Sequence, residues 1–385
     1  MAANSVSSKP LAVYVHIPFC VSKCQYCDFN SYSGMLSHQG EYFVAMESEL
    51  EKYTDIFLER GIGSVFFGGG TPTTVDANHL INIISKLKPY YKYSENNSSS
   101  ALEVSIECNP GTVDLHKLTL LCQAGFNRIS FGLQSVHDTE LSALGRVHLY
   151  DDFAQAFFNA REAGFKNINV DLMFGIPEQT VSSWRVTLAT ILNLRPEHIS
   201  AYALKVEEDT PFYNRSDLNL PDEDDERTMY KLALEFFATE GYGHYEISNW
   251  SLPNLECKQN LTYWMCEEYV GLGAGAHSYL DDLRFGNVND ILEYIKLAPN
   301  CDNKEEVYKI DRDEQMKEFV MLGLRCCKGV SQIQFRSRFG INLDARFKRE
   351  IEKLLSNRIV EFDDDFLKLT PHGFDFANEA FIEFV

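Results

Sequence analysis

Three cysteines near the start of the chain have a spacing that suits iron–sulfur chemistry. Cys20, Cys24 and Cys27 lie in the segment HIPFCVSKCQYCDF, with the pattern Cys-x3-Cys-x2-Cys. Three thiolates on one short loop can hold three irons of a cubane [4Fe–4S] cluster, whereas ordinary clusters use four cysteines. The fourth iron would then be open to chelation by a small molecule. The triad is therefore the predicted metal centre.

Zinc and thiol redox chemistry are the alternatives for these cysteines. A structural zinc site needs four ligands, usually from two closely spaced pairs. No second pair with suitable spacing follows, because Cys257 and Cys266 are nine residues apart. A redox pair of Cys24 and Cys27 would need a different local context. Since no secretion signal is visible, metal binding or buried thiols are favoured over disulfides for the ten cysteines.

A glycine-rich segment follows the second predicted strand. It reads FFGGGTPT at 66–73 and contains Gly69, Gly70 and Thr71. Glycines let backbone N–H groups approach a ligand closely, and converging N–H groups suit a carboxylate. A tight turn is the alternative interpretation. Its position after a strand, downstream of the cysteines, favours a ligand-binding loop.

These motifs resemble those of a known family. The triad, with Tyr26 before its last cysteine, is similar to the signature of the radical S-adenosylmethionine (SAM) superfamily. The preceding YVHIPFC resembles oxygen-independent coproporphyrinogen III oxidases and the HemW-type heme chaperones, over nearly the whole chain. This resemblance implies a [4Fe–4S] cluster on the triad and one or two SAM molecules. The SAM-binding residues it implies are Tyr14, Tyr26, Gly69, Gly70, Thr71, Glu107, Gln134, Arg146, Asp171, Ala203 and His277. A structural ion pair between Arg146 and Asp171 is an alternative for those two.

Two features favour the chaperone branch, whose members are understood to bind heme and pass it to acceptor proteins. The oxidase pattern has a fourth cysteine at the position that Phe29 occupies in this chain. The oxidase also has a long arm before the cluster, whereas Cys20 lies almost at the N-terminus here. Radical oxidative decarboxylation of coproporphyrinogen III remains the alternative function. SAM cleavage is left open, so whether the protein is an enzyme is not decided by the sequence.

One position departs from the chaperone pattern. The branch carries a His-Asn-x-x-Tyr-Trp segment whose histidine is implicated in heme binding, and here Gln259 takes that place. Glutamine is a poor iron ligand compared with imidazole. Heme could then be held by another residue, bound weakly, or not bound. Nearby candidate ligands are His244, His277, Cys257 and Cys266, although core packing is favoured for each.

The elements that position these residues alternate along the chain. Strands are predicted at 12–17, 64–67, 102–106, 128–131, 167–173 and 198–204. Helices are predicted at 41–60, 77–87, 115–124, 151–163, 180–194 and 222–240. Strict alternation predicts a parallel sheet, and six units instead of eight predict an incomplete (β/α)6 TIM-like barrel. Ligands of such barrels bind at the C-terminal ends of the strands.

The remaining chain predicts a small second domain. Helices at 313–325 and 343–356 precede a hairpin of 358–362 and 366–369, an order that resembles a winged helix. We expect a barrel domain at 1–245, a family-specific segment and linker at 246–305, and a winged-helix-like α+β domain at 306–385. The charged stretch 300–306 is the expected linker, and the polar stretch 94–100 an expected surface loop.

Charge and composition limit the partners. The formal net charge of −21, from 35 basic and 56 acidic residues, disfavours nucleic-acid binding and a zinc-bound nucleic-acid-associated protein. In the family that the chain resembles, the C-terminal domain covers the barrel's mouth or meets partners, and the resemblance implies the same here. Its basic residues are expected to be a solvated surface: Lys328, Arg336, Arg338, Arg346, Lys348 and Arg349. No apolar run approaches the roughly 18–20 residues that cross a bilayer. We expect a cytoplasmic monomer or homodimer, with an organelle and peripheral membrane contact left open.

Overall fold

A twelve-stranded sheet forms the centre of the computed structural model, which describes residues 9–92 and 102–385. Six of its strands are parallel and adjacent in chain order, which confirms the predicted alternation. They are β1 (Leu11–Ile17), β4 (Ile62–Gly69), β5 (Glu103–Cys108), β6 (Arg128–Gln134), β7 (Asn167–Phe174) and β8 (His198–Ala203). The polar loop expected at 94–100 lies outside the described residues.

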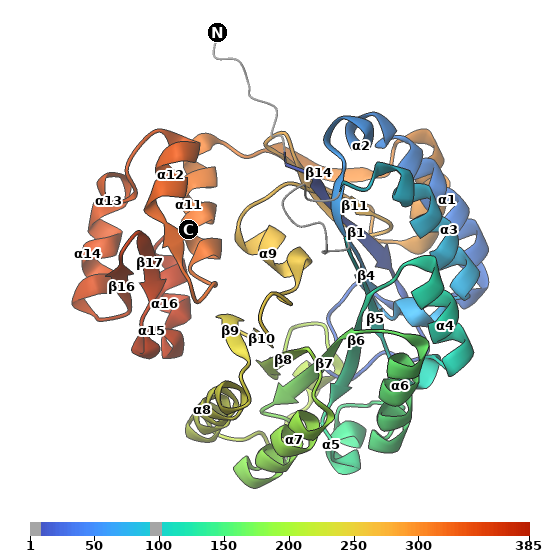
Figure 1. Cartoon of the computed structure of the whole chain (residues 1–385), viewed down its shortest axis with the longest axis horizontal. Helices are drawn as coiled ribbons and strands as arrows, with labels where there is room; N and C mark the ends of the chain where they lie inside the picture. The colour runs from blue at the N-terminus through green and yellow to red at the C-terminus, as the bar shows by residue number, and fades with distance from the viewer. Residues whose placement is uncertain (1–8, 93–101) are drawn as a thin grey trace.

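Helices cover the outer, convex face of this curved sheet (Figure 1). They are α1 (Gln39–Glu51), α2 (Thr54–Arg60), α3 (Ala77–Leu87), α4 (Leu115–Ala124), α5 (Asp138–Ala143), α6 (Tyr150–Ala163), α7 (Val181–Leu194) and α8 (Glu223–Thr239). Local sequence fixes several ends: Asp76 and Asp114 cap α3 and α4, and Gly125 ends α4 in the left-handed conformation. The helix predicted over 41–60 is wrong in its continuity, because Lys52 and Tyr53 separate α1 from α2.

Six further strands of the large sheet were not predicted. After β8, the hairpin of β9 (Gly243–Glu246) and β10 (Asn249–Ser251) closes one edge. The chain then returns through α9 (Lys258–Trp264) to β11 (Tyr269–Leu272), which pairs in parallel with β1. The strands β12 (His277–Leu280), β13 (Leu283–Asn287) and β14 (Lys304–Lys309) continue the sheet, with α10 (Ile291–Leu297) between the last two. The linker expected at 300–306 is therefore wrong in part, because its second half starts edge strand β14.

A buried carboxylate joins this returning segment to the first helix. Glu49 of α1 is 1% exposed. It accepts hydrogen bonds from Tyr294 Oη at 2.5 Å, Asn287 Nδ2 at 2.7 Å, and both Gly273 N and Asn303 Nδ2 at 2.9 Å. Burial raises the pKa of Glu49, and the four donors oppose that rise. One side chain thus ties four positions of the segment 273–303 to α1.

The C-terminal domain has its own hydrophobic cluster and a three-stranded antiparallel sheet. Its strands are β15 (Val330–Ser331), β16 (Val360–Asp363) and β17 (Phe366–Leu369). Its helices are α11 (Arg312–Gly323), α12 (Gln332–Phe339), α13 (Leu343–Arg346), α14 (Lys348–Ser356), α15 (Pro371–Asp375) and α16 (Ala377–Ile382). The predicted hairpin is present, and the helix predicted over 343–356 is interrupted at Phe347. The winged-helix-like α+β architecture is confirmed.

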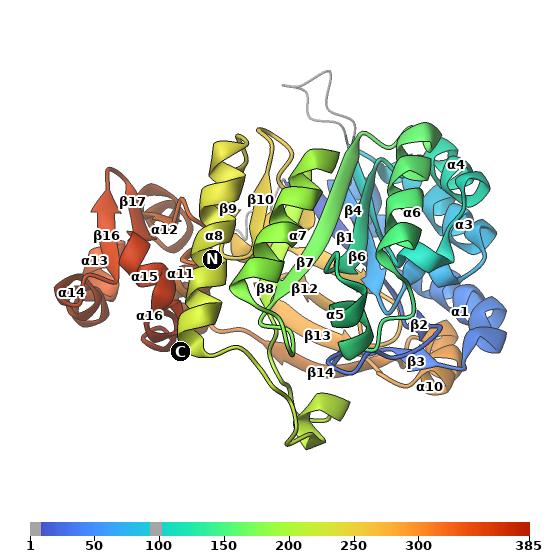
Figure 2. The ribbon, with the colours of Figure 1, turned by 90° about the horizontal axis from the view of Figure 1, so that it is seen from below.

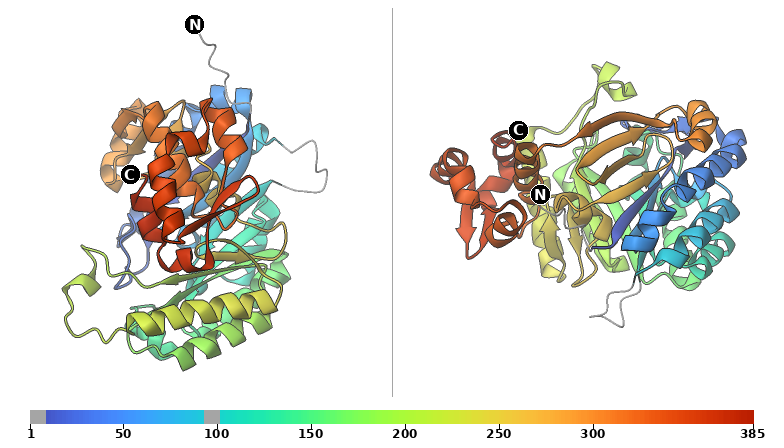
Figure 3. Two further views of the ribbon diagram at one scale, coloured as in Figure 1. Left: turned by 90° about the vertical axis from the view of Figure 1, so that its left-hand side faces the viewer. Right: turned by 90° about the horizontal axis from the view of Figure 1, so that it is seen from above.

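This domain lies on the open side of the partial barrel, with α9 between them (Figures 1 and 3). Arg284 of β13 donates two hydrogen bonds to Glu318 of α11, at 2.6 and 2.9 Å. Arg338 of α12 donates to the Cys266 carbonyl after α9 at 3.0 Å. The C-terminal domain therefore docks on the returning segment. No helix in residues 9–92 or 102–385 is long and apolar enough to cross a membrane.

Candidate functional site

Cys20 ends the short strand β2 (Phe19–Cys20), which pairs with β3 (Tyr32–Ser33), and Cys24 and Cys27 lie on the loop that follows β2. The loop is held from both sides. Gln25 N donates to the Leu144 carbonyl at 3.0 Å, and Phe212 N donates to the Gln25 carbonyl at 3.0 Å. These backbone bonds fix the segment that carries the three thiols above the ends of the barrel strands.

The thiols of the triad influence one another. Cys20 is 8% exposed, and Cys24 and Cys27 are half-buried. Burial raises the pKa of Cys20 and of Cys27, and negative charge on Cys24 raises both further. Metal binding must displace the proton of each thiol, so loading of this site consumes base.

Within residues 9–92 and 102–385, no three His, Cys, Asp or Glu side chains are arranged to hold one metal ion. The triad is proposed for a cluster, in which each thiolate binds a different iron. Its sulfurs therefore need not converge on one point. The proposed set of cysteines is compatible with this finding.

The glycine-rich loop packs directly against the cysteine loop. Gly70 N donates to the Ile17 carbonyl and Thr71 N to the Phe19 carbonyl, both at 2.9 Å. A Cβ at Gly70 would lie 2.9 Å from the Phe19 carbonyl oxygen and 3.0 Å from the sulfur of Cys20. Glycine is therefore required here by close approach. The Thr71 hydroxyl lies 3.6 Å from the Cys20 sulfur, within hydrogen-bond reach.

Two carboxylates lie on β5 and β7, the strands on either side of β6. Glu107, next to the last residue of β5, accepts a hydrogen bond from Gly69 N at 3.0 Å. Burial and the negative charge of Asp171 raise the pKa of Glu107 to about 8. Asp171 of β7 accepts from Ser130 Oγ at 2.9 Å and from Asn169 Nδ2 at 2.7 Å, and burial raises its pKa too. The pair places hydrogen-bonding oxygens at the wall of a cavity.

Arg146 connects the cysteine loop to the barrel. Its guanidinium lies 3.5 Å from the Cys24 sulfur and donates to Asn109 Oδ1 at 2.7 Å and to the Gly132 carbonyl. Among the described residues it forms no ion pair with Asp171, so that alternative from the sequence is not seen. The arginine instead supplies a fixed positive charge beside one thiol.

A cavity of about 720 Å³ brings together most of the proposed residues. Twelve of the fourteen line it: Cys20, Cys24, Tyr26, Cys27, Gly69, Gly70, Thr71, Glu107, Gln134, Arg146, Asp171 and Ala203. Gln134 has φ of 77° where β6 shifts register, and its Oε1 accepts from Tyr202 Oη at 3.0 Å. The volume is within the range of small-molecule sites.

The other two proposed residues, Tyr14 and His277, line a second cavity of about 320 Å³. The two cavities adjoin, since Phe29, Gly69 and Glu107 line both. Tyr14 Oη lies 3.0 Å from His16 Nδ1, and His16 Nε2 lies 2.8 Å from the Asn30 carbonyl that accepts its proton. Tyr14 therefore donates to His16. Burial lowers the pKa of His16 to about 4, which keeps the ring neutral.

The residues considered for heme have very different surroundings. Gln259 is 2% exposed, and Cys257 is 1% exposed. His244 stacks on Trp250 with ring centroids 4.6 Å apart, and burial lowers its pKa to about 4. Cys266 is buried in the C-terminal domain's cluster. Of the four candidates, His277 alone is exposed and lines a cavity.

Several cavity residues were not found from the sequence. Asn109 follows strand β5 directly, so its place at a strand end offered a signal, whereas Ser130 lies in the first half of β6 and offered none. Tyr202 on β8 offered the same signal as Asn109. Arg325 comes from the C-terminal domain, and no local pattern indicated that it would line this cavity.

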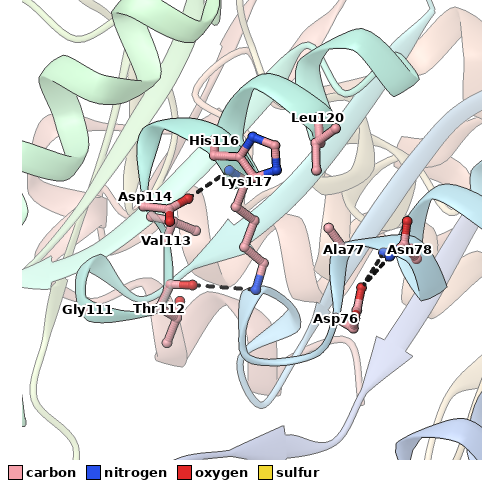
Figure 4. A pocket seen from close by; sticks show the side chains of 10 residues that line it. All are labelled: Asp76, Ala77, Asn78, Gly111, Thr112, Val113, Asp114, His116, Lys117 and Leu120. Atoms are coloured by element: carbon pink, nitrogen blue, oxygen red, sulfur yellow. Dashed lines mark hydrogen bonds between the residues drawn. The ribbon is translucent and has the colours of Figure 1, made fainter.

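A third cavity lies on the outside, between the first turns of α3 and α4 (Figure 4). Lys117 occupies it and donates to the carbonyls of Thr73 and Val75, the latter at 2.8 Å, and of Thr112 at 3.5 Å. Burial lowers the pKa of this lysine. Because Thr73 is the last residue of the glycine-rich segment, Lys117 holds the end of that segment in place.

Comparisons with known proteins identify the family of the chain. A family model of the Radical SAM superfamily matches residues 14–191, and one of the HemN C-terminal domain matches residues 310–376. The heme chaperone HemW of Bacillus subtilis is 37% identical over 97% of this chain and 99% of its own length. HemW of Lactococcus lactis is 32% identical over 98% of both chains.

The solved structure of coproporphyrinogen III oxidase (HemN) from Escherichia coli superposes with a TM-score of 0.85. It is 22% identical and covers 99% of this chain and 91% of that one, which shows a shared fold. Together with the curated relatives, it confirms the resemblance stated from the cysteine loop and YVHIPFC. The chain belongs to the HemW family of the radical SAM superfamily.

Proposed function

We propose that the protein binds heme and passes it to an acceptor protein, on a scaffold that holds a [4Fe–4S] cluster and SAM. The observation that carries the proposal is the 37% identity to a heme chaperone over nearly the full length of both chains. The acceptor would be a protein that takes up heme. The protein would act in the cytoplasm as a monomer or homodimer.

The chain's own residues suit both cofactors. Cys20, Cys24 and Cys27 would hold the cluster, and the glycine-rich loop and the carboxylates of the larger cavity would hold SAM. When bound, the pair supplies one-electron cleavage of SAM to a 5′-deoxyadenosyl radical. Tyr26, Tyr202 and Met173 line the same cavity and would keep water from it. Arg146 would hold positive charge beside the cluster.

Phe29 argues against the oxidase as the main function. It stands where the oxidase pattern has a fourth cysteine, is 60% exposed, and lines both cavities. A phenyl ring offers no ligand to iron. It offers an apolar face on which a flat ligand can lie.

We propose His277 as the residue that binds heme iron in place of the missing family histidine. His277 starts β12 and lines the smaller cavity with Tyr263 and Tyr269. Its ring has no hydrogen-bond partner among the residues that the structure describes. Gln259 of α9, by contrast, is buried and lines neither of these two cavities.

Heme titration of the anaerobically reconstituted protein tests the proposal. Wild type should show a new absorbance band with one heme bound per chain. His277→Ala should lose or shift that band, and the exposed His116→Ala should bind as wild type does. A wild-type protein with no heme band would contradict the proposed function. If His277→Ala shows the same band as wild type, the assignment of His277 as the iron-binding residue is contradicted, but heme binding by the protein is not.

A separate assay tests whether the protein decarboxylates coproporphyrinogen III. The reconstituted protein is incubated anaerobically with dithionite, SAM and coproporphyrinogen III, and the tetrapyrroles are separated chromatographically. The proposal expects no protoporphyrinogen. Its formation at a steady rate would make decarboxylation the function instead.

A further inference from the structure

Four cationic side chains line the larger cavity: Lys23, Arg146, Lys205 and Arg325. Lys23 donates to the Phe29 carbonyl at 3.2 Å, and Arg146 donates to Asn109 Oδ1 at 2.7 Å. Lys205 forms an ion pair with Glu207 at 2.6 Å. Arg325 differs from them. Its guanidinium makes no hydrogen bond or ion pair with any residue in the described part of the chain. It therefore remains available to an acceptor inside the cavity.

Backbone bonds hold Arg325 at this position. The segment after α11 forms a β-bridge with the end of β9, in which Glu246 opposes Cys326. Ile247 N donates to the Arg325 carbonyl at 3.2 Å, and Cys327 N donates to the Tyr245 carbonyl at 3.0 Å. Arg325 is thus fixed by the docking of the C-terminal domain on the barrel, although it belongs to the C-terminal domain.

Aromatic rings fix its side chain. The guanidinium carbon lies 4.3 Å from the ring centre of Trp264 in α9 and 5.7 Å from that of Phe381 in α16. Such stacking orients the plane of the guanidinium and leaves its edges free to donate. The Nε atom of Arg325 is buried and has no hydrogen-bond partner within the described residues. Arg146 of the same cavity also has an unpaired Nε, but its Nη2 donates to Asn109 and Gly132, whereas Arg325 has no hydrogen-bond partner for any nitrogen of its guanidinium among the described residues.

The acid that Arg325 influences, Glu246, does not satisfy it. Arg325 attracts the carboxylate of Glu246, but within the described chain the two form no ion pair. One oxygen of Glu246 accepts from Asn249, and the other is buried without a partner. Burial is the main influence on this carboxyl and raises its pKa. Arg325 and Glu246 therefore do not neutralise each other by direct contact.

We propose that Arg325 is an anchor for a carboxylate of the ligand in the larger cavity, contributed by the C-terminal domain. A guanidinium presents two parallel N–H donors that match a carboxylate. Two ligands of the proposed function carry that group: heme through its propionates, and SAM through its amino-acid end. The inference rests on the proposed function for the identity of these ligands.

Anaerobic equilibrium titrations of the reconstituted full chain separate these sources. The ligands are heme, heme dimethyl ester, which has no free carboxylate, and SAM. The variants are Arg325→Gln, which keeps a planar group without the charge, and Arg325→Lys, which keeps the charge without the fork. Arg336→Gln is the matched control, since Arg336 is an exposed arginine of the same domain.

If heme is the source, Arg325→Gln should weaken heme binding by about tenfold or more, the value of a hydrogen bond to a charged group. The dimethyl ester should bind wild type and variant equally. If SAM is the source, the tenfold loss falls on SAM instead, and the anchor still stands. Unchanged affinities for both heme and SAM would overturn the inference. If the wild-type protein binds SAM but no heme, the proposed heme-transfer function is contradicted, but the inference about Arg325 is not. The effect of Arg325→Gln on SAM affinity then decides whether Arg325 binds a carboxylate.

Folding of the variants is checked by thermal unfolding, because the stacked arginine also packs. Should Arg325→Gln fail to fold, Arg325→Lys answers the same question. A weaker affinity for heme or SAM with the lysine supports the forked contact, and wild-type affinities for both overturn it.

Discussion

Arg146 Nη1 lies 3.5 Å from the sulfur of Cys24, which belongs to the cysteine loop. The same guanidinium donates to Asn109 and to the Gly132 carbonyl, so its position is fixed from three directions. A positive charge held beside a thiol favours the thiolate that binds iron. Arg146 is thus placed to influence whatever charge the triad carries.

Replacing Arg146 by Met should make the reduction potential of the reconstituted cluster more negative. A cluster gains negative charge on reduction, and the fixed cation nearby stabilises that charge. Potentiometric titration followed by electron paramagnetic resonance measures the shift. Arg185→Met, an exposed arginine on α7, should leave the potential unchanged. A potential that does not fall in R146M would show that the arginine acts only in packing.

Gly70→Ala should lower iron content after reconstitution and destabilise the fold by about 1–3 kcal/mol, as overpacking does. The new Cβ would press on the Phe19 carbonyl and the Cys20 sulfur, at 2.9 and 3.0 Å. Iron per chain and urea unfolding measure the two effects. Gly111→Ala is the control, because a Cβ there meets nothing within 4 Å. Equal iron content in both variants would count against a tight fit between the two loops.

Glu49→Ala should destabilise the protein by about 3 kcal/mol or more, because it leaves buried donors unpaired. The donors are Tyr294, Asn287, Gly273 and Asn303, all in the returning segment. The midpoint of urea unfolding measures the loss. Glu51→Ala, on an exposed position of the same helix, should change it by less than about 0.5 kcal/mol. Similar midpoints of urea unfolding for both variants would show that Glu49 does not stabilise the contact between α1 and the returning segment.

His244→Phe should reduce the sensitivity of the fold to acid. Burial holds the pKa of His244 at about 4 in the folded protein, below the usual histidine value of 6.5. Between those values the unfolded chain binds a proton that the folded chain does not, so the unfolding free energy falls as pH falls from 6.5 towards 4. Without this histidine, the loss between pH 7 and pH 5 should be about 2 kcal/mol smaller.

Urea unfolding at the two pH values measures the His244 effect. Tyr230→Phe controls for packing, since Tyr230 contacts the same ring but does not take up a proton in this range. Parallel pH dependence in His244→Phe and wild type would contradict the buried neutral ring.

The six strand–helix units were predictable because each combines a buried apolar strand with a longer amphipathic helix. Ala77–Leu87 and Leu115–Ala124 match their predicted limits, since aspartate caps begin both helices. The break between α1 and α2 was not predictable from periodicity, because Tyr53 and Phe57 are both buried and continue the apolar stripe. The predicted ligand residues lie together because they fall at the ends of adjacent parallel strands.

The returning strands and Arg325 were beyond sequence reasoning for a physical reason. Strands β9 to β13 are three to five residues long, and β14 is exposed throughout, so none shows a readable pattern. Pairing of β11 with β1 is a contact between distant parts of the chain, and only the folded sheet reveals it. The place of Arg325 depends in turn on how one domain docks on the other.

The parallel pairing of β11 with β1 has a consequence for biosynthesis. The cysteines emerge from the ribosome early, whereas Tyr269–Leu272, which pairs with the strand that precedes the cysteine loop, is translated much later. Until then the nascent thiols lack their finished surroundings and are open to oxidants. Iron loading into a completed pocket therefore has to follow synthesis of the second half of the polypeptide, so a truncated product would carry its thiols unprotected.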